Sequence, residues 1–213
     1  YLYYMNNGTS NSFVLGLSLS RNSIDNPIYT RSGSTFSLDL SLTPPVSLFS
    51  NKNWKALSEA NTQKAKEEMY KWIEYWKLKF KARTYTPLTD PEGKWTLVLM
   101  TRADIGLLGS YNKYLKSPFE TFYVGGDGMS GSYGYAQETI ALRGYDNGAF
   151  TPWTKDGYAY TRFCMELHFP FMLQPSTTIY GLAFVEGGNA WTDVKDFSPF
   201  NLKKSAGAGV RIY

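Results

Sequence analysis

The sequence predicts an all-β protein, namely part of an antiparallel transmembrane β-barrel. Three observations favour this class: apolar and polar residues alternate strictly over many segments, one strand carries a row of cations on a single face, and short connections alternate with long ones. No run approaches the ~18 consecutive apolar residues of a membrane helix, so the sequence excludes a helical membrane protein. The 43% content of hydrophobic residues argues against disorder.

The first two strands are expected at residues 12–20 and 34–42. In both segments leucine and phenylalanine alternate with small polar residues, so one face is apolar and the other is polar. Turn-forming residues at 25–33 connect the two strands. This pattern predicts a hairpin at the start of the sheet.

The third strand, at 72–84, has an aromatic face and a cationic face. The cationic face consists of Lys77, Lys79, Lys81 and Arg83. Such a row would repel itself in a crowded core, but it suits a water-filled lumen with the aromatic face turned to lipid. Glu74 falls on the lipid-facing side and is expected near the membrane boundary. Judged from this strand alone, a soluble hairpin with one wet face is an equally good interpretation.

The remaining strands are expected at 94–106, 158–169, 177–187 and 203–213, and residues 1–5 indicate a further stub. In the strand at 158–169 the polar face carries Glu166 and His168. The strand at 177–187 is nearly apolar on both faces, so its single charge, Glu186, assigns the lumen side. The chain therefore supplies seven to eight strands.

The connections alternate in length. Short ones lie near Asn26, Pro91 and Pro175, and long ones are expected at about 43–71, 107–157 and 189–202. This asymmetry is typical of outer-membrane barrels, and a soluble β-sandwich gives no reason for it. A stretch at 54–69 is compatible with a helix that caps the outer rim. Residues 1–213 are thus expected to form part of one outer-membrane β-barrel domain, and the strands that close it must come from outside this sequence.

Several possible catalytic or binding motifs are better explained in other ways. The glycine pattern at 126–131 matches a dinucleotide motif, but no helix start follows it. A Ser-His-Asp triad could use only His168, for which a place in the lumen lining is favoured. The single cysteine, Cys164, rules out an internal disulfide and a multi-cysteine metal cluster, and an inert strand residue is expected there. We expect no enzyme activity and no cofactor, and the net charge of +4 is too small to indicate nucleic-acid binding.

One loop segment carries a family resemblance. Leu142, Arg143, Gly144 and Tyr145 resemble the conserved loop motif of the BamA family, the outer-membrane β-barrel assembly insertases. Further segments resemble that family in the same order: 25–34, 123–126, 184–191 and 205–211. Residues 70–75 and 126–131 resemble its Bacteroidetes branch. The resemblance covers essentially the whole chain.

The resemblance implies a 16-stranded barrel preceded by periplasmic POTRA domains, with the first and last strands absent from this chain. It implies that the protein folds and inserts nascent outer-membrane proteins in the bacterial outer membrane, in contact with lipids and Bam accessory lipoproteins. It also implies that the loop folds into the lumen, where Arg143 meets Glu166 and Glu186 on the wall. An arginine stays charged and needs a carboxylate when held in a narrow lumen, so we expect Arg143 within ion-pair reach of Glu166 or Glu186.

Three other functions stay open from the sequence. One is a sister transporter of the TamA-like or two-partner secretion type, and another is the barrel domain of a patatin-like lipase. The third is a passive porin, whose constriction loop would not need the motif at 142–145. Residues preceding Tyr1 would discriminate these functions from that of an insertase, because several POTRA domains imply an insertase and a Gly-x-Ser-x-Gly domain implies a lipase.

Overall fold

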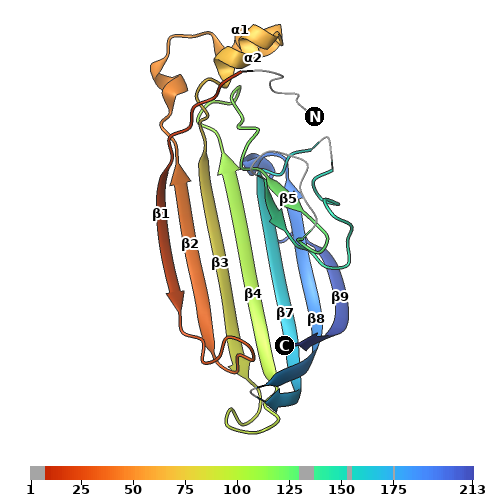
Figure 1. Ribbon diagram of the computed structural model, residues 1–213. Coiled ribbons are helices and arrows are strands. Elements are labelled where there is room, and N and C mark those ends of the chain that lie inside the picture. Colours follow the sequence, from red (N-terminus) through yellow and green to blue (C-terminus); the bar gives the residue numbers. More distant parts are fainter. Residues whose placement is uncertain (1–7, 130–136, 153–154, 175) are drawn as a thin grey trace.

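The computed structural model describes residues 8–129, 137–152, 155–174 and 176–213, in which one antiparallel sheet of seven strands dominates the fold. Its strands are β1 Leu15–Asn22, β2 Gly33–Leu42, β3 Trp76–Pro87, β4 Val98–Gly109, β7 Ala159–Gln174, β8 Thr177–Trp191 and β9 Lys203–Ile212. Each strand hydrogen-bonds to the next in that order (Figure 1). The expectation of seven antiparallel strands is therefore confirmed, while the expected stub at 1–5 lies outside the described residues.

The sheet is curved and open (Figure 1). Within the described residues, no strand pairs with the outer edge of β1 or of β9. Both edges therefore present unpaired backbone N–H and C=O groups, which a membrane does not tolerate. An open sheet of this kind is one segment of a wider barrel, whose closure needs further strands.

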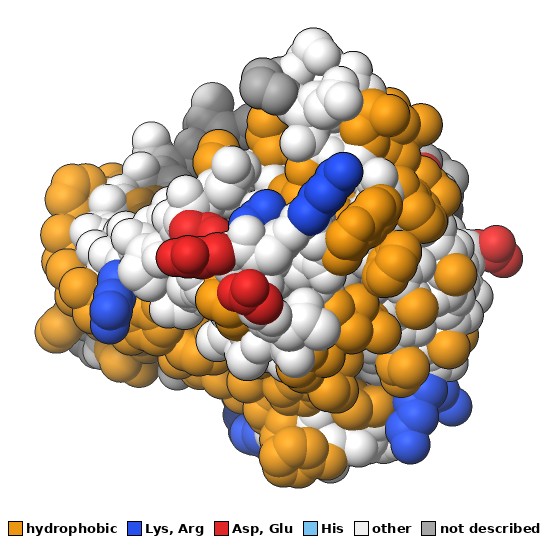
Figure 2. Space-filling view, turned by 90° about the horizontal axis from the view of Figure 1, so that it is seen from below, with side chains coloured by type: hydrophobic (Ala, Val, Ile, Leu, Met, Phe, Trp, Pro, Cys, Tyr) orange, Lys and Arg blue, Asp and Glu red, His pale blue; other side chains and the backbone are white. Residues whose placement is uncertain are grey.

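Side chains alternate between the two faces of the sheet, as period two predicts. On β7, Glu166 and His168 are buried on the inner face, Glu166 against Arg143 of the loop at 110–158 and His168 near Tyr29 of the connection at 23–32. Met165 and Leu167 alternate with them along the strand and are exposed on the outer face. Figure 2 shows hydrophobic side chains spread over much of the sides of the molecule. An exposed apolar surface of this extent suits contact with lipid.

The two ends of the sheet carry different kinds of connection. At the end that we call the turn end, neighbouring strands are joined by residues 23–32, 88–97 and 175–176. At the opposite loop end they are joined by residues 43–75, 110–158 and 192–202. The helical segments there are η1 Val46–Phe49, α1 Trp54–Ala60, α2 Gln63–Met69 and η2 Val194–Asp196. Figure 1 shows α1 and α2 beyond the strand ends.

The stretch at 54–69 forms two helices rather than the single helix with which the sequence is compatible. Asn61 adopts a left-handed conformation, with φ of 46°, and ends α1. The side chain of Thr62 then accepts a hydrogen bond from the backbone N–H of Ala65 and caps the start of α2. Among the described residues, no helix has both the length and the apolar character needed to cross a bilayer.

The expected position of Glu74 on the lipid-facing side is wrong. Residues Ile73, Glu74 and Tyr75 are all buried, so period two does not extend to them, and β3 begins only at Trp76. A carboxylate oxygen of Glu74 instead accepts a hydrogen bond of 2.9 Å from the backbone N–H of Ser47. Glu74 therefore helps to fold the loop at 43–75.

The loop at 110–158 folds onto the inner face of the sheet. It contains a small parallel sheet of β5 Phe122–Val124 and β6 Glu138–Ile140, and β5 contacts β7 and β8 (Figure 1). An apolar core fastens this small sheet to the wall; its buried members include Leu108, Phe122, Val124, Ile140 and Tyr160. The rings of Phe122 and Tyr160 meet edge to face at 4.7 Å. This core positions the residues that follow β6.

Candidate functional site

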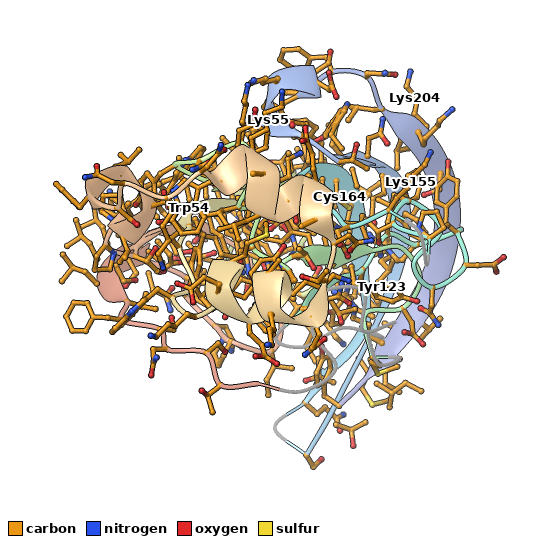
Figure 3. All side chains as sticks on the ribbon, turned by 90° about the horizontal axis from the view of Figure 1, so that it is seen from above. Trp54, Lys55, Tyr123, Lys155, Cys164 and Lys204 are labelled. Atoms are coloured by element: carbon orange, nitrogen blue, oxygen red, sulfur yellow. The ribbon has the colours of Figure 1, made fainter. Side chains whose placement is uncertain are left out.

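The segment at 142–145 reaches the inner face of β8 because it continues from β6. The backbone N–H of Leu142 donates to the carbonyl of Gly126 at 3.0 Å, in an isolated antiparallel bridge just beyond β5 and β6. Figure 3, which views the molecule from the loop end, shows Tyr123 of β5 and Cys164 of β7 inside the arc of the sheet. Of the glycine pattern at 126–131, residues 130 and 131 lie outside the described part of the chain.

Arg143 contacts both carboxylates that the sequence singled out. Its Nη2 atom lies 2.7 Å from Glu166 Oε1 and 2.7 Å from Glu186 Oε2, and its Nε donates to Glu186 Oε2 at 2.9 Å. Its backbone N–H donates to Glu186 Oε1 at 3.1 Å. The guanidinium also lies over the ring of Phe184, with Cζ 3.7 Å from the ring centroid. The structure therefore fixes the side chain through charge, hydrogen bonds and stacking together.

Each carboxylate is shared with a second cation. Arg162 donates to both oxygens of Glu186, at 3.2 and 3.1 Å. Arg211 Nη2 lies 3.2 Å from Glu166 Oε2. Glu166 and Glu186 are 2% and 1% exposed, so these partners supply the compensation that a buried carboxylate needs. We call Arg143, Arg162, Arg211, Glu166 and Glu186 the arginine–carboxylate cluster.

Arg162 and His168 share the polar face of the strand predicted at 158–169, but the sequence gives no reason to assign either to the site. His168 Nε2 lies 2.8 Å from Glu166 Oε2. Arg211 lies in the strand predicted at 203–213, and the sequence assigns it no role either. For Arg162, His168 and Arg211 the available signal was parity, that is, the alternation of residues between the two faces of a strand. Parity does not reveal which residues of different strands are neighbours. That information lies in the register, for example the pairing of Cys164 with Glu186.

Cys164 lies under the guanidinium of Arg143. Its Sγ accepts a hydrogen bond from Arg143 Nη2 at 3.0 Å, and the residue is 3% exposed. A cavity of about 200 Å³ beside it is lined chiefly by charged side chains: Arg83, Arg102, Asp127, Arg162, Glu166 and Arg211. The inner face is thus polar at this level. In the described ranges, no group of three or more His, Cys, Asp and Glu residues could hold a metal ion.

The other residues of the motif hold the loop against β8 and β9. Leu142 is 1% exposed and packs against Gly188, where a side chain would come within 2.8 Å of Leu142 Cδ1. Tyr145 donates its hydroxyl hydrogen to the carbonyl of Lys204 at 2.8 Å. Gly144 has a φ of 83°, which strongly favours glycine. The structure thus brings together all six residues that the sequence predicted.

Gly144→Ala is expected to loosen the loop. The left-handed φ costs a non-glycine residue about 1 to 2 kcal/mol, and the new Cβ would lie 2.9 Å from Ser205 Cβ. We expect Cys164 in the whole protein to react faster with a water-soluble maleimide, because Arg143 covers it less of the time. Gly209→Ala is the matched control, since its Cβ meets no atom within 4 Å. Equal rates for both variants would show that Gly144 has no such role.

Comparisons with known proteins identify the family. The family model described as the Omp85 superfamily domain matches residues 2–213. The chain belongs to the Omp85 superfamily. Among proteins with curated descriptions, none matches it in sequence.

A solved structure of BamA from Haemophilus ducreyi lacking POTRA domains 1–3 has a similar fold. The two share 18% sequence identity with a TM-score of 0.63, over 93% of this chain and 36% of that one. This Omp85 chain therefore spans about a third of the length of that BamA structure. Together with the exposed outer face and the open edges, the match shows that the fold is a partial antiparallel transmembrane β-barrel.

Proposed function

We propose that this chain is part of the barrel of an outer-membrane insertase, which folds and inserts other β-barrel proteins in the bacterial outer membrane. The observation that carries the proposal is the contact of Arg143, from the in-folded loop, with Glu166 and Glu186 on the wall of an Omp85 barrel. In this proposal the contact is a latch that holds the loop inside the lumen. No bond is made or broken, so the protein is not an enzyme.

The geometry supports a division of labour within the whole barrel. The latched loop contacts β7 and β8, and the hydroxyl of Tyr145 also reaches the backbone of the edge strand β9 at Lys204. An insertase needs an exposed strand edge that templates incoming strands through backbone hydrogen bonds. We assign that edge to strands outside this sequence and assign to this segment the lipid-facing wall and the lumen latch.

The proposed partners follow from the same assignment. Outer-membrane lipids would contact the apolar outer face, and nascent outer-membrane proteins would be the clients. POTRA domains, Bam accessory lipoproteins and the remaining barrel strands would belong to the whole protein. A BamA protein of the Bacteroidetes branch is the specific identity that we propose.

The test is reconstitution of the whole protein in lipid vesicles with an unfolded outer-membrane β-barrel protein as client. We expect the client to fold at least about tenfold faster than in empty vesicles, a difference of 1.4 kcal/mol in barrier. Folding is measured as protease-resistant, heat-modifiable client. No acceleration would contradict the proposal. Export of a partner protein would then support a transporter, release of fatty acids a lipase, and ion conductance alone a porin.

A further inference from the structure

We propose that the in-folded loop has a second anchor, in which Glu138 and Glu120 bind the lysine row of β3 and position Arg143 over its carboxylates. The contacts with β3 stand independently of the proposed function. Only the consequence for client insertion rests on it. The anchor was not expected from the sequence, which placed the lysines in the lumen without partners.

The second anchor consists of four ion pairs. Glu138 Oε2 lies 3.4 Å from Lys77 Nζ and 3.1 Å from Lys79 Nζ, and Glu138 Oε1 lies 3.1 Å from Lys81 Nζ. Glu120 Oε2 lies 3.1 Å from Lys77 Nζ. One loop carboxylate thus meets three successive inner-face lysines, and a second carboxylate meets the lysine nearest the loop end.

Burial makes these contacts matter more than exposed ion pairs. The side chain of Lys77 is 5% exposed, and its ammonium lies 4.9 Å from the ring centroid of Phe122 in β5. An ammonium buried this deeply needs a carboxylate partner. Burial alone would raise the pKa of Glu138, but the charges of Lys81, Lys77 and Lys79 outweigh it and lower the pKa. Glu138 therefore stays ionised where it meets the lysines.

The backbone is strained at Glu120, the loop residue that pairs with Lys77. Glu120 has a φ of 65°, a left-handed conformation that non-glycine residues rarely adopt. It lies two residues before β5 begins, at the point where its side chain reaches Lys77. Strained residues persist where surrounding contacts hold them, and such residues gather at functional clamps. The strain at Glu120 is consistent with a loop that is held by its contacts with β3.

The spacing of the two anchors matches the chain that joins them. Across the sheet, β3 and β8 are three strand spacings apart, about 14 Å. Along the strands, Lys81 is level with Gly188, so Glu186 lies one side-chain repeat away, roughly 7 Å. The separation is therefore about 16 Å. The five-residue step from Glu138 to Arg143 spans about the same distance when extended. Docking Glu138 on the lysines thus delivers Arg143 to Glu186.

The two anchors have opposite polarity. At β3 the loop supplies carboxylates to wall cations, whereas at β7 and β8 it supplies a cation to wall carboxylates. If the loop shifted across the sheet in either direction, like charges would meet. Glu138 is therefore a positioning residue that sets the register of the loop on the wall.

Cys164 provides the test, because Arg143 covers its thiol in the docked loop. The whole protein in vesicles is labelled with a water-soluble maleimide, and a Cys164→Ala protein measures labelling elsewhere. We expect Glu138→Lys to label Cys164 at least about tenfold faster than wild type, equivalent to 1.4 kcal/mol, and Glu138→Gln to lie between them. Glu59→Lys, on the exposed face of α1, is the matched control and should label like wild type.

A charge swap decides whether the ion pairs of residue 138 themselves keep Arg143 over Cys164. Adding Lys79→Glu and Lys81→Glu to Glu138→Lys should return labelling towards the wild-type rate, because two of the three pairs of residue 138 re-form with reversed sign and Lys77 keeps Glu120. Labelling of both Glu138 variants at the wild-type rate would overturn the second anchor. So would a folded, heat-modifiable swap protein that labels as fast as Glu138→Lys. The readout needs no client, so failure of the proposed function would not affect it.

Discussion

Arg143→Ala is expected to release the loop from the wall and to slow client insertion by the whole protein at least about tenfold. The change removes every side-chain contact between the loop motif and the two carboxylates. It leaves Glu186 with Arg162 and leaves Glu166 with Arg211. Removing one member of a buried ion pair costs about 3 to 5 kcal/mol, and the partial exposure of Arg143 places this case at the lower end.

Arg143→Lys separates charge from geometry. A lysine keeps the positive charge and the backbone N–H bond to Glu186, but it cannot donate from Nε and Nη2 together or stack as a plane on Phe184. We therefore expect insertion rates in the order wild type, Arg143→Lys and Arg143→Ala. Lys55→Ala, which removes the cation of an exposed ion pair on α1, should match wild type. Equal insertion by Arg143→Ala and wild type would refute the latch.

Glu186→Gln is expected to lower the heat resistance of the barrel more than the matching change at the other carboxylate, Glu166→Gln. Glutamine has the same shape as glutamate, so the effect comes from charge. It leaves Arg143 with one carboxylate, Glu166, and leaves Arg162 without an ionised carboxylate partner within the described part of the chain. The expected loss of stability is about 3 kcal/mol, measured as the midpoint of heat modification of the whole protein in detergent.

A double mutant shows whether the cluster acts as a unit. Once Glu186 is neutral, Arg143→Ala removes a cation that has lost its main partner. The cost of the double mutant should therefore fall well short of the sum of the two single costs. Glu166→Gln is the matched comparison and should cost less, because it frees Arg211, whose side chain is 37% exposed. Full additivity would contradict shared stabilisation by Glu186.

Alternation in the sequence predicted the strands and their faces well where apolar and polar residues contrast sharply. Alternation failed to predict the strand ends where neighbouring residues do not differ in polarity. The strand predicted to end at 169 continues to Gln174 through Phe169, Pro170 and Phe171, which are all apolar, and a register shift follows Pro170. The strand predicted to end at 187 continues through glycines to Trp191. Neither stretch has a period-two pattern to extend.

The candidate site was predictable only in part. Parity placed Glu166 and Glu186 on the lumen face, and the family resemblance connected them with Arg143. Strand register, which parity cannot supply, brings Arg162 and Arg211 to the same carboxylates. The partners of the lysine row, Glu120 and Glu138, come from a loop whose path depends on the apolar packing of β5 and β6. No local pattern in the sequence encodes that path.

The central claim is that the apolar side chains of these strands face lipid while the ionic ones face a wet lumen that holds the loop. A cysteine scan of residues 36 to 41 in β2 tests it most directly, using the whole protein in bilayers with Cys164 replaced by alanine. Fluorophores at 36, 38 and 40 should be quenched by lipid-attached nitroxides, and cysteines at 37, 39 and 41 should react with a water-soluble maleimide instead. Uniform quenching, or alternation with the opposite phase, would contradict the account.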